Sequence, residues 1–233
     1  MMKKYCFTLL LVLLAVPVYG GMEDDPLLAK LMVDQLEYRF GDGDNPLAWD
    51  AQGWIGKDLN KLWIRSEGEY LHDRIDETEL QLLYSKAIAP FWEAQIGWRG
   101  DLEPNPTRNW LALELEGLAP YFFDVEASIF LGENGRTAAR LKLEYELLFT
   151  QKLILVPEFE VNLYGKGDPA VGIGSGFSDM EAGLRLRYEI RREFSPYIGI
   201  NWLHLFGDTA YYAAEEGDDT DTVLFLVGIR TWF

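Results

Sequence analysis

The chain has 233 residues, of which 48% are hydrophobic, 25% charged and 14% aromatic, a length that suits a single domain. Acidic side chains outnumber basic ones by 38 to 21, for a formal charge of −17, which argues against nucleic-acid binding by a basic surface. The one cysteine, Cys6, lies in a segment expected to be removed, so the mature chain is expected to have no disulfide and no thiolate metal site.

The first residues have the features of a secretory signal peptide. Residues 1–4 (MMKK) form a short basic start, and residues 5–19 form an apolar run that is short for a membrane span of about 20 residues. Small residues precede a cleavage site before Gly21. We therefore expect a signal peptide at residues 1–20 and one domain at residues 21–233, with an uncleaved N-terminal anchor as the alternative. Loss of Lys3 and Lys4 shifts the formal charge from −17 to −19.

After Gly21 the recurring pattern is alternation with a period of two, which predicts β-strands with two unlike faces. Leucines alternate with Glu114 and Glu116 in one segment, and apolar residues alternate with Arg185 and Arg187 in another. No later stretch has 18 consecutive apolar residues, so no transmembrane helix is predicted. The pattern predicts twelve strands, at residues 30–41, 47–57, 61–72, 76–88, 91–101, 108–118, 121–132, 136–149, 152–165, 178–192, 195–207 and 220–233.

The predicted connections alternate between two kinds. One set is tight, at residues 56–60, 89–90, 119–120, 150–151 and 193–196, and the other is acidic and mostly longer, at residues 41–46, 101–107, 165–177 and 207–222. Short turns at one rim and long loops at the other are typical of the periplasmic and extracellular ends of outer-membrane barrels. An even strand number places both termini at the periplasmic rim. Residues 172–176 (GIGSG) are expected to form a flexible loop, and Pro157 to mark a bulge.

The size of the barrel decides which face points outward. About eight strands leave an interior that side chains can fill, and the diameter grows with strand number. Twelve strands with an apolar interior would enclose an unfilled cavity, whereas a polar interior can hold water and paired charges. The sequence therefore predicts an all-β, antiparallel, up-and-down transmembrane β-barrel in contact with outer-membrane lipid, with leucines toward lipid and ionised residues toward the lumen.

Aromatic residues near the tight turns support this orientation. Such residues form girdles at the lipid–water interface, and the chain ends on the aromatic Phe233, which resembles the assembly signal of outer-membrane proteins. The residues assigned to the girdle are Trp54, Trp63, Trp92, Tyr121, Phe123, Phe194, Tyr197, Trp232 and Phe233.

Several segments resemble the copper resistance protein B family. They include residues 22–30 (MEDDPLLAK), 54–63 (WIGKDLNKLW), 84–92 (YSKAIAPFW), 118–127 (LAPYFFDVEA), 144–153 (EYELLFTQKL), 162–166 (NLYGK), 172–176 (GIGSG) and 184–197 (LRLRYEIRREFSPY). The resemblance runs from about residue 22 to the C-terminus. It implies an exported protein of the outer membrane of a Gram-negative bacterium that handles copper ions beside a periplasmic multicopper oxidase, and it does not imply an enzyme.

The chain departs from the family pattern in one respect. Family members often carry a Met- and His-rich stretch between the signal peptide and the barrel, and thioether and imidazole ligands suit copper. Here Gly21 leads almost directly into the first strand, and the mature chain keeps Met22, Met32, Met180, His72 and His204. Of these, His72, Met180 and His204 fall toward the extracellular rim in the strand map. They form either a metal site at the mouth or three unrelated surface residues.

The polar strand faces give a second candidate site. A ring of carboxylates in the lumen can select cations; alternatively, arginines and glutamates form a network that closes the lumen, because unpaired buried charges are costly. The residues expected to line the lumen are Asp50, Arg65, Glu67, Arg99, Glu114, Glu116, Asp124, Glu126, Arg140, Glu144, Glu158, Glu160, Arg185, Arg187, Glu189 and Arg230.

Three functions are consistent with these features. The resemblance favours copper homeostasis, with copper bound or moved at the outer membrane. The second is an outer-membrane lipid hydrolase with a Ser/His site, but neither of the two histidines has an evident serine partner and orienting group. The third is a generic pore for small solutes.

Overall fold

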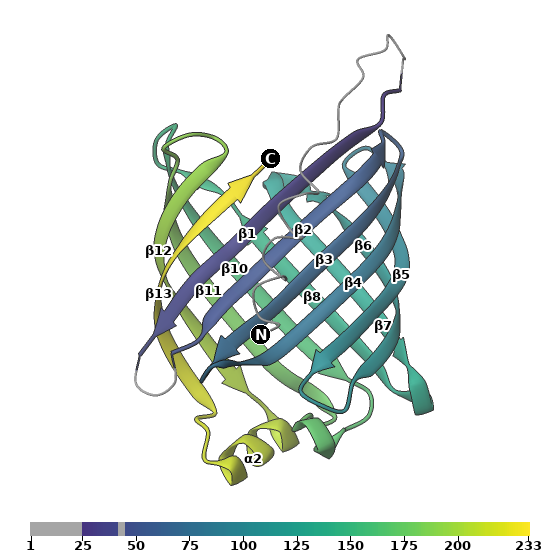
Figure 1. Ribbon diagram of the computed structural model, residues 1–233, viewed down its shortest axis with the longest axis vertical. Coiled ribbons are helices and arrows are strands. Elements are labelled where there is room, and N and C mark those ends of the chain that lie inside the picture. The colour runs from purple at the N-terminus through teal and green to yellow at the C-terminus, as the bar shows by residue number, and fades with distance from the viewer. Residues whose placement is uncertain (1–24, 42–44) are drawn as a thin grey trace, which may run out of the picture.

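The computed structural model describes residues 25–41 and 45–233, which form one closed antiparallel β-barrel (Figure 1). The expected signal peptide lies outside the described residues. Each strand pairs with the next one along the chain, except that β8 and β9 both pair with β10, and β1 pairs with β13, so the sheet has no free edge. The strands are β1 (Leu28–Phe40), β2 (Leu47–Lys57), β3 (Asn60–Leu71), β4 (Arg74–Ala89), β5 (Trp92–Glu103), β6 (Arg108–Ala119), β7 (Phe123–Gly132), β8 (Thr137–Tyr145), β9 (Leu147–Leu148), β10 (Leu153–Tyr164), β11 (Gly176–Tyr188), β12 (Phe194–Leu205) and β13 (Asp221–Trp232).

The ring has the twelve strands that the sequence predicts, with the eighth broken into β8 and β9. Both pieces pair with β10 in one continuous register, and the break lies opposite Pro157. Proline has no N–H to donate to the ladder, so pairing with this neighbour stops and then resumes. On its other side Pro157 pairs regularly with Leu184. The bulge expected at Pro157 is therefore wrong: the proline interrupts one ladder without shifting it.

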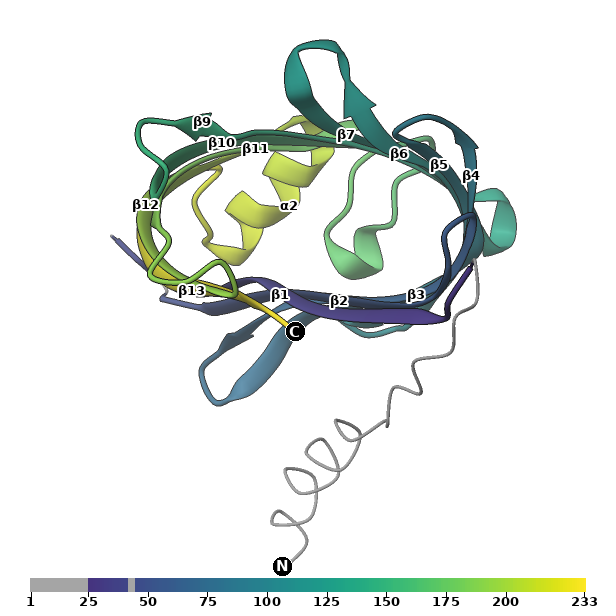
Figure 2. The ribbon, with the colours of Figure 1, turned by 90° about the horizontal axis from the view of Figure 1, so that it is seen from above.

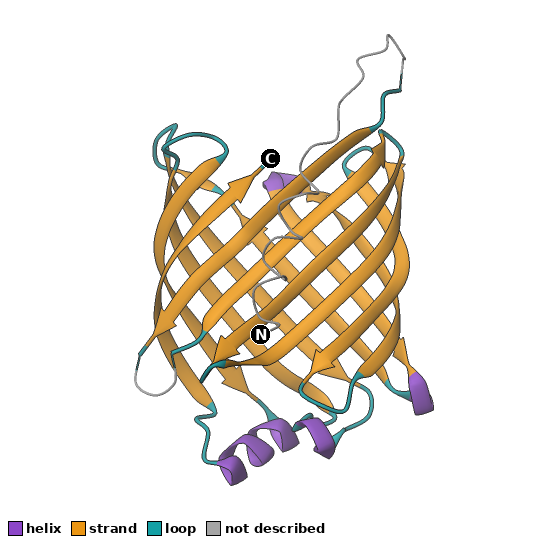
Figure 3. Cartoon of the chain, in the orientation of Figure 1, coloured by secondary structure: helices purple, strands orange, loops and turns teal. Residues whose placement is uncertain are grey.

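The two rims differ as the loop lengths predict. We call the end with the short connections the tight-turn rim; the start of β1 and the C-terminus both lie there (Figure 1). The opposite end, the long-loop rim, carries the 3₁₀ turns η3 (Glu133–Gly135) and η4 (Pro169–Val171) and the helix α2 (Gly207–Glu216), drawn in Figure 3 with η2 (Pro120–Phe122) of the tight-turn rim. Among the described residues, no helix is both long and apolar enough to span a bilayer.

The outer wall is apolar and the inner wall is polar. Leu113, Ile129 and Ile198 are 38%, 54% and 60% exposed, whereas Glu114 and Ser128, which alternate with the first two, are 5% and 2% exposed. A soluble protein would leave this apolar surface in water, but lipid tails solvate it in a membrane barrel. The alternation along each strand therefore fixes the orientation, because successive side chains point to opposite faces.

Four aromatic residues assigned to the lipid girdle face the lumen, so that part of the prediction is wrong. Trp63 and Tyr197 are 6% and 4% exposed, Trp54 packs on Trp63 with ring centroids 6.1 Å apart, and Trp232 lines a cavity at the tight-turn rim. Each has the strand parity of a lumen residue, such as Arg65 two positions after Trp63. Clustering near a rim indicates how deep in the membrane a residue lies. Only its position in the alternation along the strand indicates whether it faces lipid or the lumen. The girdle residues on the outer wall or in turns are Trp92, Tyr121, Phe123, Phe194 and Phe233.

The barrel is flattened in cross-section. Seen along its axis, β1, β2 and β3 form one broad wall and β6, β7, β10 and β11 form the wall opposite (Figure 2). Long side chains can therefore reach from wall to wall. This shape positions the charged groups described below.

Two loops fold over the long-loop rim. Within the loop between β12 and β13, where the sequence predicts a long acidic connection, α2 lies inside the barrel outline when viewed along the axis (Figure 2). Thr209 of α2 accepts a hydrogen bond from the backbone N–H of Gly174 (2.9 Å) and bonds to Ser178 (3.0 Å). These bonds tie α2 to the loop between β10 and β11, so residues 172–176 are held at the mouth.

The loop between β10 and β11 is also held by charge. The Asp168 carboxylate pairs with Arg108 (2.6 Å) and Arg136 (3.0 Å). The hydrogen bond from Arg108, together with both positive charges, lowers the pKa of Asp168 below its ordinary value of 3.8. The backbone of Asp168 forms two further bonds with Ile173.

A charge on the outer wall should destabilise the barrel. Leu113 lies in the middle of β6, and Leu113→Arg places an arginine near the bilayer midplane, at an expected cost of about 2–4 kcal/mol. Urea unfolding in lipid vesicles measures it. Leu59→Arg, in an exposed turn at the tight-turn rim, should cost about 1 kcal/mol or less. Equal effects of the two substitutions would contradict the assigned lipid face.

Asp168→Asn should loosen the loop between β10 and β11. Because the folded pKa of Asp168 is lowered, its stabilising effect is complete above pH 3.8 and is lost as the pH falls through the lowered value. Above that pH Asp168 is fully ionised, so the protection of the Ile173 amide against hydrogen exchange should be high and constant. In the variant this protection should be lower. Asp219→Asn, in the other loop of the same rim, is the control and should leave this amide unchanged.

Candidate functional site, the charged lumen

The interior face carries ionisable residues in every part of the barrel. The structure places on this face the sixteen residues expected from alternation, where they form ion pairs or line two cavities. These residues are Asp50, Arg65, Glu67, Arg99, Glu114, Glu116, Asp124, Glu126, Arg140, Glu144, Glu158, Glu160, Arg185, Arg187, Glu189 and Arg230. Three groups of cross-strand pairs organise them.

The first group is centred on Arg65 of β3. Its guanidinium pairs with Glu114 (3.0 Å) and Glu116 (2.6 Å) of β6 and with Glu126 (3.1 Å) of β7. Arg65 also lies over the ring of Trp63, 5.2 Å from the centroid. One arginine thus bridges three carboxylates and offsets part of the repulsion between Glu116 and Glu126, which are direct cross-strand partners.

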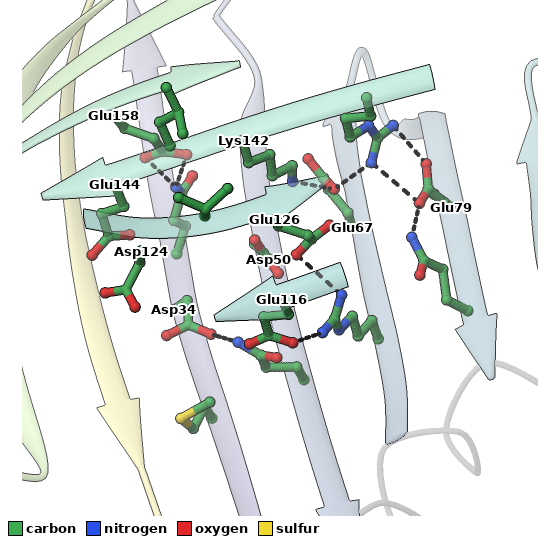
Figure 4. A pocket seen from close by; sticks show the side chains of 18 of the residues that line it. Asp34, Asp50, Glu67, Glu79, Glu116, Asp124, Glu126, Lys142, Glu144 and Glu158 are labelled. Carbon is green, nitrogen blue, oxygen red and sulfur yellow. Dashed lines mark hydrogen bonds and ion pairs between the residues drawn. The ribbon is translucent and has the colours of Figure 1, made fainter. Parts of the chain in front are cut away.

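The second group is centred on Glu79 of β4. Its carboxylate pairs with Arg99 of β5 (2.8 Å) and Arg140 of β8 (2.9 Å). Lys142 of β8 pairs with Glu67 of β3 (3.0 Å). Because β8 lies between β7 and β10, in the wall opposite β3, the pairs that Arg140 and Lys142 form cross the lumen (Figure 4).

The third group surrounds Glu37 of β1, which is 1% exposed. It accepts hydrogen bonds from Arg185 (3.0 Å), Arg39 (2.8 Å) and the Tyr197 hydroxyl (3.0 Å). Arg185 also pairs with Glu158. Buried carboxylates of this kind persist only when paired and hydrogen-bonded, so the three groups brace the flattened barrel from inside.

An acidic cavity of about 260 Å³ remains between these groups. Nine carboxylates line it with four cationic side chains, Arg65, Arg140, Lys142 and Arg230. Figure 4 shows the carboxylates that surround it. They are Asp34, Asp50, Glu67, Glu79, Glu116, Asp124, Glu126, Glu144 and Glu158.

Three of these carboxylates, Asp50, Asp124 and Glu144, form no hydrogen bond or ion pair with any other described residue. Asp124 and Glu144 are direct cross-strand partners, and Glu144 is in turn paired with Glu158. On the opposite wall Asp50 is the partner of Glu67. Like charges directly opposite each other are destabilising, so two acidic rows face one cavity with too few cations to neutralise them. This arrangement attracts cations.

The residues expected to line the lumen omit four residues of this interior, Glu37, Glu79, Lys142 and Met32. The alternation could have found three of them: Lys142 lies on the polar face of its segment with Arg140 and Glu144, and Glu79 and Glu37 alternate with apolar neighbours in β4 and β1. Met32 could not be found that way. A bulge after Val33 changes the parity of β1 and brings the Met32 thioether to the acidic cavity. Nothing in the local sequence marks a bulge at this position.

The three residues proposed as a metal site at the mouth do not come together in this structure. Met180 and His204 are direct cross-strand partners on β11 and β12, with the parity of the outer wall, and the His204 Nδ1 bonds to Asp221 (2.8 Å). His72 lies in the turn between β3 and β4, and β13, β1 and β2 separate it from β12. Within residues 25–41 and 45–233, no three His, Cys, Asp or Glu side chains converge closely enough to hold a metal ion.

Comparisons with known proteins agree with this architecture. A family model described as copper resistance protein B precursor (CopB) matches residues 27–233. Copper resistance protein B of Escherichia coli is 42% identical over 213 residues, covering 91% of this chain and 72% of the relative. A copper resistance protein B homolog of Pseudomonas syringae pv. tomato is 43% identical over 212 residues, with the same coverage.

The barrel also resembles a solved structure. The NanC porin superposes with a TM-score of 0.56 over 88% of this chain and 99% of the porin, at 11% identity; at this identity the likeness shows the fold alone. The family match, in contrast, spans nearly all of the described residues. The chain belongs to the copper resistance protein B family.

Proposed function

We propose that this barrel binds copper ions in its lumen and moves them across the outer membrane, in copper homeostasis shared with periplasmic copper proteins. Family membership supports a role in copper resistance. The observation that carries the finer proposal is the acidic cavity, where Met32 supplies a thioether and where Asp50, Asp124 and Glu144 have no ion-pair partner within residues 25–41 and 45–233.

The donor atoms around the cavity suit copper as a transported ion. Carboxylate oxygens bind divalent cations, and a thioether is a soft ligand that favours Cu(I). A cation that enters between the acidic rows relieves the repulsion between Asp124 and Glu144. Conduction needs binding strong enough for entry and weak enough for release, and a set of separated carboxylates with one thioether meets both conditions.

The pair of Met180 and His204 is a second place where copper would bind. An imidazole and a thioether suit copper, and the two residues are opposite each other near the long-loop rim. Asp221 fixes the His204 ring by its hydrogen bond to Nδ1, which leaves Nε2 for a ligand. His72 would act separately, from its own turn.

The alternatives are less well supported. A lipid hydrolase needs a serine bonded to a histidine base. Asp221 holds the His204 ring through Nδ1, as the orienting acid of such a triad does, but among the described residues no serine is hydrogen-bonded to His204. A generic pore for small solutes would not need two rows of carboxylates facing the acidic cavity. A periplasmic multicopper oxidase remains the partner that we propose from the family resemblance.

Neutralising the free carboxylates should reduce copper movement. In Asp124→Asn/Glu144→Gln, we expect copper uptake into proteoliposomes to fall on the order of tenfold, because loss of about 1.4 kcal/mol of cation attraction is a factor of ten. Cells that carry the variant should have the altered copper content and tolerance of a deletion strain. Flux is measured by metal analysis.

The matched control is Asp58→Asn/Glu133→Gln, which neutralises one aspartate and one glutamate in turns outside the lumen. It should leave flux within about twofold. Unchanged flux in the lumen variant, or unchanged copper content on deletion, would contradict the proposal. Equal transport of uncharged solutes by both variants would favour the generic pore, and phospholipid cleavage would favour the hydrolase.

Removing the thioether should discriminate between the copper oxidation states. Met32→Leu keeps an apolar side chain of similar volume, so the barrel should remain folded. We expect Cu(I) affinity to fall about tenfold or more while Cu(II) affinity is little changed, because carboxylates do not need the soft ligand. Competition with a coloured chelator, under reducing and oxidising conditions, measures both. A matched variant, Met180→Leu, tests the outer-wall pair.

A further inference from the structure

A second cavity opens at the tight-turn rim and differs from the first in charge. Its volume is about 860 Å³, within the range of sites that hold ligands of several linked groups. Six cationic side chains line it, Lys30, Lys152, Arg187, Arg191, Arg192 and Arg230, with two carboxylates, Glu146 and Glu189. We call this cavity the basic vestibule. Its positive charge contrasts with the formal charge of the whole chain, which is −17.

Several of these cations have no counter-ion. Within the described part of the chain, Lys152, Arg191 and Arg192 form no ion pair. Arg187 is 5% exposed and pairs with Glu146 (2.5 Å), yet its Nε is buried without a hydrogen-bond acceptor. A buried N–H without an acceptor is costly, so the pair with Glu146 satisfies the Arg187 guanidinium only in part.

The position of the cations indicates how a ligand enters. Arg187 and Arg230 have the parity of the lumen face, and Arg191 and Arg192 lie in the turn that connects β11 to β12, beside the C-terminal end of β13 (Figure 1). The vestibule thus opens at the mouth of the barrel and not onto the lipid-facing wall. An occupant arrives from the aqueous side of this rim, which is the periplasmic side in outer-membrane barrels.

We propose that the basic vestibule binds an acidic polypeptide segment of a periplasmic protein. Clustered arginines recognise acidic motifs through charge-assisted hydrogen bonds, and the volume accommodates a short run of aspartate or glutamate side chains. This inference does not depend on copper being the transported ion.

One residue, Arg230, connects the basic vestibule to the acidic cavity of the lumen. Arg230 lines both the vestibule and the acidic cavity, and it pairs with Asp34 (3.1 Å) and Glu146 (3.7 Å). Glu146 also pairs with Arg187. An acidic segment bound to Arg187 competes with Glu146 for its guanidinium, so docking changes the pairing of the residue that separates the two cavities.

The test uses the mature full-length chain in a non-ionic detergent and a short, fluorescently labelled oligo-glutamate peptide. Fluorescence anisotropy should show saturable binding that weakens as salt is added. In Arg191→Gln/Arg192→Gln the affinity should fall at least about tenfold. These side chains are exposed in a turn, so the fold is preserved, which heat-modified gel migration verifies.

The matched control is Lys57→Gln/Lys86→Gln, which removes two exposed cations from the same rim outside the vestibule and should leave the affinity within about twofold. No binding of oligo-glutamate at low salt, or equal losses in both double variants, would overturn the proposal. The peptide is also titrated in nanodiscs with and without phosphatidylglycerol. Binding retained in both supports a polypeptide ligand, and abolition by the anionic lipid would assign the site to lipid headgroups and overturn it.

Discussion

The pairing of ionised side chains across a flattened, closed barrel is the constraint on which the rest of the structure depends. An unpaired charge inside a low-dielectric wall costs several kcal/mol, whereas the outer wall must be apolar to meet lipid. Arg65, Glu79 and Glu37 each satisfy this constraint by bridging several strands. The flattening (Figure 2) brings opposite walls together, and pairs such as Lys142 with Glu67 and Arg140 with Glu79 join them.

The exceptions to pairing mark the functional regions. Among the described residues, the carboxylates of Asp50, Asp124 and Glu144 in the acidic cavity have no ion-pair partner, and neither do Arg191 and Arg192 at the tight-turn rim. Uncompensated charge of one sign in each cavity gives the barrel an electrostatic polarity along its axis, with acidic loops at the other rim. Such fields raise the local concentration of counter-ions, so one lumen can attract a cation while its mouth attracts an acidic protein segment.

The two readings of the lumen charges, a cation-selective ring and a network that closes the lumen, describe different parts of one interior. Around Glu79 and Glu37 the charges are paired and fill the space between the walls, together with aromatic side chains such as Trp63 and Phe130. Between these groups the acidic cavity persists. Arg230 stands between that cavity and the basic vestibule, so a change in its pairing connects the two.

The sequence by itself determined the fold class, the twelve strands and the alternation of polar and apolar faces, because a period of two assigns side chains to faces without reference to the tertiary structure. Resemblance in long segments determined the family. The tertiary structure decided what parity and spacing cannot express: the bulge that turns Met32 inward, the ladder that Pro157 interrupts and the separation of His72 from His204. It also decided which charges meet, since pairs such as Arg140 with Glu79 join residues 61 positions apart and depend on the flattening of the closed barrel.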